Sequence, residues 1–160
     1  MEEIRHVGRL IRIAEHAISQ EIHKSHESLG ITSSQGFMLG YLTRRQLTGD
    51  TPIYAKDAEI HFGVKHSSIS GVLQRLESKG FLVFEEDCND RRCKKIVLTQ
   101  RALDIHDEIE KQIRRTERRI FSGMTEDEVE IFHRLLKKAA ANLTGGETDC
   151  LPALYPVKED

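Results

Sequence analysis

Between residues 53 and 99 the chain holds two short helical patterns separated by a glycine, and two β-rich runs follow at once. The second helical pattern spans His66–Ser78, and its apolar residues recur at the spacing of one helix face. In chain order the segments are the helix 54–62, the break at Gly63, the helix His66–Ser78, the run 81–85, the polar loop 87–92 and the run 95–98. This order predicts a helix-turn-helix with an attached β-hairpin.

Longer helical patterns lie on both sides of this unit. Apolar residues step by threes and fours over 4–22, which predicts a long first helix that ends near Leu29. The same spacing over 102–120 predicts a second long helix that ends before Gly123.

Two further helices are marked by capping-box patterns at their starts. Thr32 with Gln35, and Thr125 with Glu128, place a hydroxyl three residues before a side chain that can bond back to the helix start. The predicted fold class is therefore mainly α, an α+β winged helix: a winged helix-turn-helix lobe with long helices at both ends of the chain. We expect a single domain over 1–145 and an irregular tail over 146–160.

Charge is distributed unevenly along the chain. The formal net charge of −2 argues against a nucleic-acid partner, because phosphate binding depends on Lys and Arg. Over 61–101, however, basic residues outnumber acidic ones. This local excess is the charge distribution expected of a DNA-binding segment, although a solvated surface can carry it too.

The helix His66–Ser78 is the candidate reader of the DNA major groove. Glutamine and arginine can make paired hydrogen bonds to base edges, and small hydroxyls near a helix start can bind phosphate together with the backbone amides. An ordinary amphipathic helix would also carry a polar outer face. The candidate DNA-binding residues on or beside this helix are Lys65, His66, Ser67, Ser68, Ser70, Gln74 and Arg75.

The hairpin loop supplies three further candidates, Asp90, Arg91 and Arg92. An arginine at a hairpin tip can enter the narrow, electronegative minor groove. Asp90 is expected to hold the Arg92 guanidinium in a forked hydrogen bond that fixes its direction.

The long apolar stripes at the two ends of the chain need a partner. A symmetric dimer buries both stripes and spaces two reading helices for half-sites about one helical turn apart. We therefore expect a homodimer in which 1–30 and 100–145 are dimerisation helices and about 31–99 is the DNA-binding lobe.

Three segments together resemble the MarR family of transcriptional regulators: 67–82, Asn89-Asp90-Arg91-Arg92, and Ile96-Val97-Leu98-Thr99. They are similar to that family's recognition helix, its wing and the exit into its dimerisation helix, and the similarity extends over roughly 4–143. The resemblance implies a triangular homodimer that binds a pseudo-palindromic double-stranded operator. It also implies a small organic or phenolic effector between the dimer helices and the winged lobe, where His16, Phe37 and Tyr41 could lie.

At several positions the chain departs from the family pattern. Gly71 stands where many members carry an arginine, and Glu59 occupies a position that is often alanine. Glu85 and Glu86 follow the first wing strand, where a basic residue is usual, and Ala102 replaces a common glycine. The operator preference of relatives is therefore not expected to carry over.

The predicted function is that of a sequence-specific, DNA-binding transcriptional regulator, a ligand-responsive repressor that acts as a homodimer. One alternative is a redox-responsive regulator that uses Cys88 and Cys93, which bracket the hairpin tip. Another is a winged helix that binds only proteins. An enzyme is not expected, because the sequence has no phosphate-binding glycine loop, nucleophile elbow or HExxH motif.

No cofactor or metal is expected, because the eight histidines lack the spacing of metal ligands. No apolar stretch is long enough to span a membrane, and residues 1–5 do not resemble a secretory signal. These features predict a cytoplasmic protein with no membrane partner.

Overall fold

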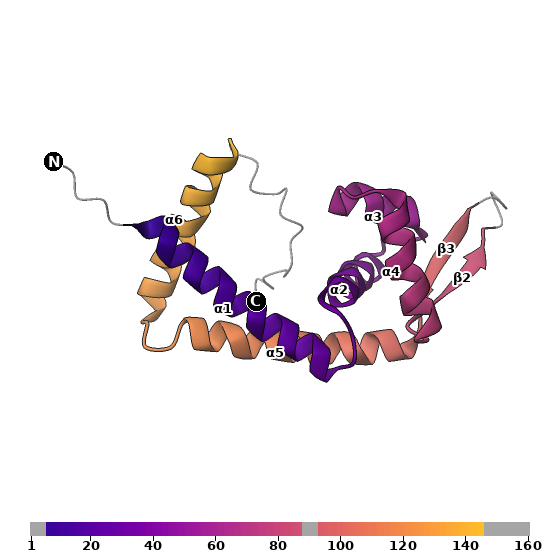
Figure 1. Ribbon diagram of the computed structural model, residues 1–160, viewed down its shortest axis with the longest axis horizontal. Coiled ribbons are helices and arrows are strands. Elements are labelled where there is room, and N and C mark those ends of the chain that lie inside the picture. The colour runs from indigo at the N-terminus through magenta and orange to yellow at the C-terminus, as the bar shows by residue number, and fades with distance from the viewer. Residues whose placement is uncertain (1–5, 88–92, 146–160) are drawn as a thin grey trace.

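The computed structural model describes residues 6–87 and 93–145, and within them it has six helices and a small antiparallel sheet that lies at one end of the molecule (Figure 1). The elements in chain order are α1 (Val7–Ser28), α2 (Ser33–Leu47), β1 (Ile53–Tyr54), α3 (Ala55–Phe62), α4 (His66–Ser78), β2 (Leu82–Glu86), β3 (Lys94–Leu98), α5 (Gln100–Ile120) and α6 (Glu126–Thr144). This arrangement confirms the predicted mainly α fold with a helix-turn-helix and a β-hairpin. The first helix spans Val7–Ser28 in the structure, and Ile4, the first residue of the predicted stripe, lies outside the described residues.

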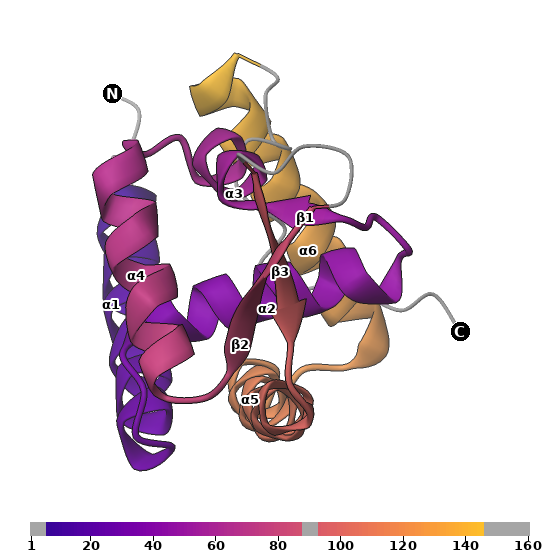
Figure 2. The ribbon, with the colours of Figure 1, turned by 90° about the vertical axis from the view of Figure 1, so that its right-hand side faces the viewer.

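Helix α2 lies at the centre of the winged lobe. It packs against α1, α4, α5 and β1, and its Leu39 and Leu42 have no exposed surface. Figure 2 shows α4 on one side of the sheet and α5, viewed along its axis, below it. Leu73, Leu76 and Phe81 complete the same apolar core, so the helix-turn-helix and the start of the hairpin share one interior.

The sheet has the order β1-β3-β2, with both pairs antiparallel. Strand β3 pairs with β2 from Leu82 opposite Leu98 to Glu86 opposite Lys94, which confirms the predicted hairpin. Strand β1 was not predicted as a strand. It is two residues long and pairs Ile53 with Ile96, so its residues carry no alternation that a sequence pattern could reveal.

Both predicted capping boxes are present. The Gln35 amide donates to Thr32 Oγ1 at 3.3 Å, and the Thr32 amide donates to Gln35 Oε1 at 3.0 Å. At α6 the Glu128 amide donates to Thr125 Oγ1 at 3.3 Å, and the Thr125 amide donates to Glu128 Oε2 at 2.8 Å. Each box satisfies backbone donors that a helix start leaves without helical partners.

The long helices extend away from the lobe. Helices α1 and α5 run side by side, and α6 stands at the end of α5 that is remote from the sheet (Figure 1). The apolar stripes of α1 and α6 are largely exposed. Helix α6 contains no buried residue at all. Exposed apolar side chains are Val7, Leu10, Ile11 and Ile13 on α1, and Ile131, Phe132, Leu135, Leu136 and Leu143 on α6. Within the described ranges, none of the helices is both long and apolar enough to cross a membrane.

His26 is a buried polar residue at the junction of α1 and α2. Its imidazole is 3% exposed and meets the ring of Phe37 edge-on, with ring centroids 5.8 Å apart. It also lies directly against Gly36, where an added Cβ would come closer than 3.0 Å to the ring. Gly36 therefore permits the close approach of α1 and α2.

Replacement of Gly36 by alanine is expected to lower the free energy of unfolding by about 1–3 kcal/mol, because the new methyl group overlaps the buried imidazole. Gly40→Ala is the matched control in the same helix, since nothing lies within 4 Å of a Cβ at that position. It should leave stability unchanged or raise it by up to about 1 kcal/mol, because alanine favours a helix. Urea unfolding at one protein concentration measures both, and equal effects would show that His26 does not limit this contact.

Acid is expected to destabilise the fold through its buried histidines. Burial lowers the pKa of His26, and the nearby charge of His23 lowers it further. Burial also lowers the pKa of His61 and of His106. These groups contribute stability that is present above the unfolded pKa of about 6.5 and is lost as pH falls toward their folded pKa values. The free energy of unfolding, measured with denaturant between about pH 7.5 and about pH 5.5, should therefore decrease as the pH falls. His26→Gln should make the dependence shallower, and an unchanged dependence would contradict the assignment to His26.

Candidate nucleic-acid interface

Helix α4 presents one apolar face inward and one polar face outward. Ile69, Leu73 and Leu76 are at most 3% exposed, and they join the core around α2. The predicted outer residues lie on the other side, where Lys65, His66, Ser67, Ser68, Gln74 and Arg75 are exposed and Ser70 is half-buried. The structure thus brings together on one helix surface all the candidates that precede the hairpin.

The start of α4 is joined to α3 by a chain of side-chain hydrogen bonds. Glu59 Oε1 on α3 lies 2.6 Å from His66 Nδ1, and His66 Nε2 lies 3.1 Å from Ser70 Oγ. The sequence singled out Glu59 only as a departure from the family pattern. Its partner could not be found from spacing, because the two residues belong to different helices whose angle is set by Gly63, at φ 61°.

The end of α4 is fixed to the α1–α2 junction by Lys79. Its Nζ donates to the Gly30 carbonyl at 2.7 Å and to Gln35 Oε1 at 3.1 Å. Gly80 follows with φ 73°, a backbone angle that glycine adopts without strain. This glycine turn confirms the predicted end of the helix and leads directly into the hairpin.

The loop end of strand β2 is bonded to strand β1. Tyr54 Oη donates to Asp87 Oδ2, and this bond raises the pKa of Tyr54 to about 12 because the carboxylate disfavours a phenolate beside it. The Asp87 amide donates to the Cys93 carbonyl at 3.2 Å and closes the ladder. Sequence reasoning missed the role of Tyr54, because its partner is contributed by a distant strand.

The acidic residues after the first wing strand stand opposite lysines. Glu85 pairs with Lys95 and Glu86 with Lys94 in the strand register, and Lys95 Nζ lies 2.9 Å from Glu85 Oε2. The negative charge of Glu85 is thus offset within the hairpin. Of the remaining predicted residues, Cys93 is exposed beside β3, whereas Cys88, Asp90, Arg91 and Arg92 lie outside the described residues.

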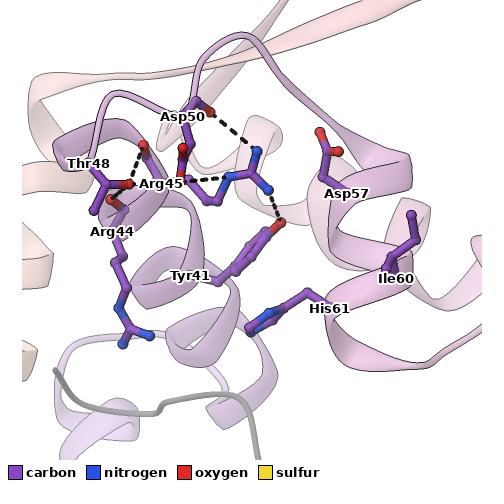
Figure 3. A pocket seen from close by; sticks show the side chains of 8 residues that line it. All are labelled: Tyr41, Arg44, Arg45, Thr48, Asp50, Asp57, Ile60 and His61. Atoms are coloured by element: carbon purple, nitrogen blue, oxygen red, sulfur yellow. Dashed lines mark hydrogen bonds and ion pairs between the residues drawn. The ribbon is translucent and has the colours of Figure 1, made fainter. Parts of the chain in front are cut away.

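A cavity of about 340 Å³ lies between α2 and α3 (Figure 3). The Tyr41 and His61 rings stack within it with centroids 4.2 Å apart, and Arg45 donates to Tyr41 Oη at 3.2 Å. Burial, followed by the charges of Arg44 and Arg45, lowers the pKa of His61. The lining residues are Tyr41, Arg44, Arg45, Thr48, Asp50, Asp57, Ile60 and His61.

Of the residues expected near an effector, only Tyr41 lines this cavity. His16 is exposed on α1, where its Nε2 lies 2.9 Å from Gln20, and Phe37 packs on His26. Within 6–87 and 93–145, no group of three or more histidine, cysteine or acidic side chains could hold a metal ion.

None of the known protein-family models matches the sequence. Solved structures do match over most of their length. A putative MarR family transcriptional regulator from Clostridium acetobutylicum is 27% identical, with a TM-score of 0.67 over 85% of this chain and 97% of that one. A mutant of S. aureus MepR bound to an oligodeoxyribonucleotide is 26% identical, with a TM-score of 0.66 over 88% and 99%. The transcription regulator MarR from Oenococcus oeni is 26% identical, with a TM-score of 0.60 over 84% and 98%.

Each of these similarities covers at least 84% of the chain. The chain is similar in fold and sequence to the MarR family of winged-helix transcriptional regulators.

Proposed function

We propose that the chain is a homodimeric repressor that binds a double-stranded operator through helix α4 and the hairpin. The observation that carries this proposal is the exposed polar face of α4, which stands opposite a fully buried apolar face. The exposed face includes Gln74 and Arg75, whose side chains can make paired hydrogen bonds to base edges. The similar S. aureus MepR mutant is bound to an oligodeoxyribonucleotide, which supports the same use of the fold.

The proposed DNA contacts divide between two grooves. In the major groove, Gln74 and Arg75 would face base edges, while Lys65, Ser67 and Ser68 at the helix start would face phosphate. His66 and Ser70 belong to the same surface. For the minor groove we propose contacts by Arg91 and Arg92, with Asp90 orienting Arg92. This part of the proposal rests on the sequence.

The homodimer is proposed from the exposed apolar surfaces of α1 and α6. Monomeric proteins rarely expose contiguous apolar surface of this kind, and a second copy of the same helices is the partner that a symmetric assembly supplies. Two-fold symmetry would then place one α4 helix at each half of a pseudo-palindromic site.

Ligand response is proposed from the cavity between α2 and α3. A volume of about 340 Å³ suits a small organic molecule, and the stacked Tyr41 and His61 rings are among the residues that line it. The Arg44 side chain lines the same cavity with its Nε buried and without a hydrogen-bond partner among the described atoms. An occupant of this cavity would contact α3, which packs directly against α4.

Arg75→Ala is expected to weaken operator binding by roughly 5- to 150-fold, because a lost base contact costs about 1–3 kcal/mol. A gel shift on the DNA upstream of the chain's own gene, repeated at several salt concentrations, measures the effect. Binding should weaken steeply with salt as counterions return to the phosphates.

Arg114→Ala is the matched control, an exposed arginine on α5 that pairs with Glu110 in its own helix. It should bind as the unsubstituted chain does. The proposal fails if binding to the upstream DNA does not exceed binding to random duplex, or if the two arginine variants behave alike.

The dimer is expected to have about twice the 18.3 kDa mass of one chain in size-exclusion chromatography with light scattering. Leu135→Glu should shift it toward the monomer, because a carboxylate would be buried in the proposed interface without a partner. Ile60→Glu changes an apolar residue that is 72% exposed on α3 and should leave the mass unchanged. A monomer at micromolar concentration would contradict the proposal.

A further inference from the structure

The hydrogen-bonded chain from Glu59 through His66 to Ser70 begins on α3 and ends on the outer face of α4. The side chain of His66 is 73% exposed, whereas that of Glu59 is 24% exposed. His66, Ser70 and Gln74 follow one another at four-residue intervals, so they form a single column on the helix. Ser70 therefore stands between the imidazole and a residue that the proposed function places at the bases.

The positions of the protons follow from the chemistry of the partners. An ionised carboxylate can only accept hydrogen bonds, so at 2.6 Å from Glu59 the Nδ1 atom of His66 must carry hydrogen. In the neutral ring Nε2 is then an acceptor. Ser70, at 3.1 Å from Nε2, must donate its hydroxyl hydrogen to it.

This donation leaves Ser70 with only its oxygen lone pairs to offer to another molecule. Phosphate oxygens, and the N7 and O6 atoms of guanine, are acceptors and cannot bond to such a hydroxyl. The exocyclic amino groups of adenine and cytosine are donors that point into the major groove, and they match it. Ser70 is one of the hydroxyls near the helix start for which the sequence predicts phosphate binding, and its hydrogen bond to His66 gives it a different chemistry.

We propose that Glu59 is a positioning residue that fixes the tautomer of His66 and so presents Ser70 as a hydrogen-bond acceptor to an amino-bearing base, adenine or cytosine. This inference rests on the proposed DNA-binding function. Stability alone gives little reason for such a chain, since exposed polar pairs contribute about 1 kcal/mol or less. Its geometry instead determines one feature of the surface, the direction of the Ser70 hydroxyl.

The first test is made on the free protein and needs no DNA. Two-dimensional ¹⁵N–¹H spectra of the imidazole rings at neutral pH should show His66 with hydrogen on Nδ1. Glu59→Ala should move the ring toward the Nε2–H form, whereas Glu77→Ala, which removes an exposed carboxylate of α4 itself, should not. If His66 carries its hydrogen on Nε2 in the unsubstituted chain, the inference is overturned.

The second test measures base preference. Each position of the operator half-site is replaced in turn by the four base pairs, and the affinity of the full-length chain is measured for each duplex. One position should favour a base with an amino group by about fivefold, the usual worth of a single hydrogen bond of about 1 kcal/mol. Ser70→Ala and Glu59→Ala should each abolish this preference, and the double variant should lose no more than either single one.

Circular dichroism and thermal unfolding serve as controls that each variant is folded. Retention of the preference in Glu59→Ala would overturn the positioning role, even if the affinity for all duplexes falls together. Absence of any specific binding by the unsubstituted chain would instead refute the proposed function. The imidazole spectra distinguish that outcome, because they report the hydrogen-bonded chain whether or not DNA binds.

Discussion

The burial of α2 is the interaction on which the rest of the structure depends. Leu39 and Leu42 have no exposed surface, and full burial of one such side chain contributes about 1.5–3 kcal/mol. Because α1, α4, α5 and β1 all contact this helix, the core that it forms joins the winged lobe to the long helices. The outward face of α4 is consequently determined from inside: with Ile69 and Leu73 held in that core, the remaining side of the helix must face solvent.

Sequence could predict those parts of the fold whose causes are local. The capping boxes at Thr32 and Thr125 each act across three residues, and Gly80 ends a helix through its own backbone freedom. Strand β1 escaped prediction because its cause is remote: Ile53 is a strand residue only by pairing with Ile96. The same reason hid the bond between Tyr54 and Asp87, which no spacing along the chain encodes.

The same distinction between local and remote causes applies to the residues of the candidate interface. Helical periodicity predicted which residues lie on the outer surface of α4, because the residues outside the buried face are the ones that can contact a ligand. What each of them can do did not follow, because Ser70 differs from Ser67 and Ser68 through its bond to His66, whose ring is in turn bonded to a carboxylate of α3. The negative charge of Glu85 likewise looks unfavourable for DNA binding in the sequence alone. In the hairpin, however, Lys95 pairs with this charge.

Lys79 connects the two parts that a dimeric regulator must coordinate. Its ammonium group holds the Gly30 carbonyl, just beyond α1, and Gln35 Oε1, which also accepts from the Thr32 amide at the start of α2. The end of α4, the end of α1 and the start of α2 therefore share one hydrogen-bonded junction. In the proposed dimer, a change in the angle between the two α1 helices would thus alter the separation of the two α4 helices. That separation is the quantity that must match the spacing of operator half-sites.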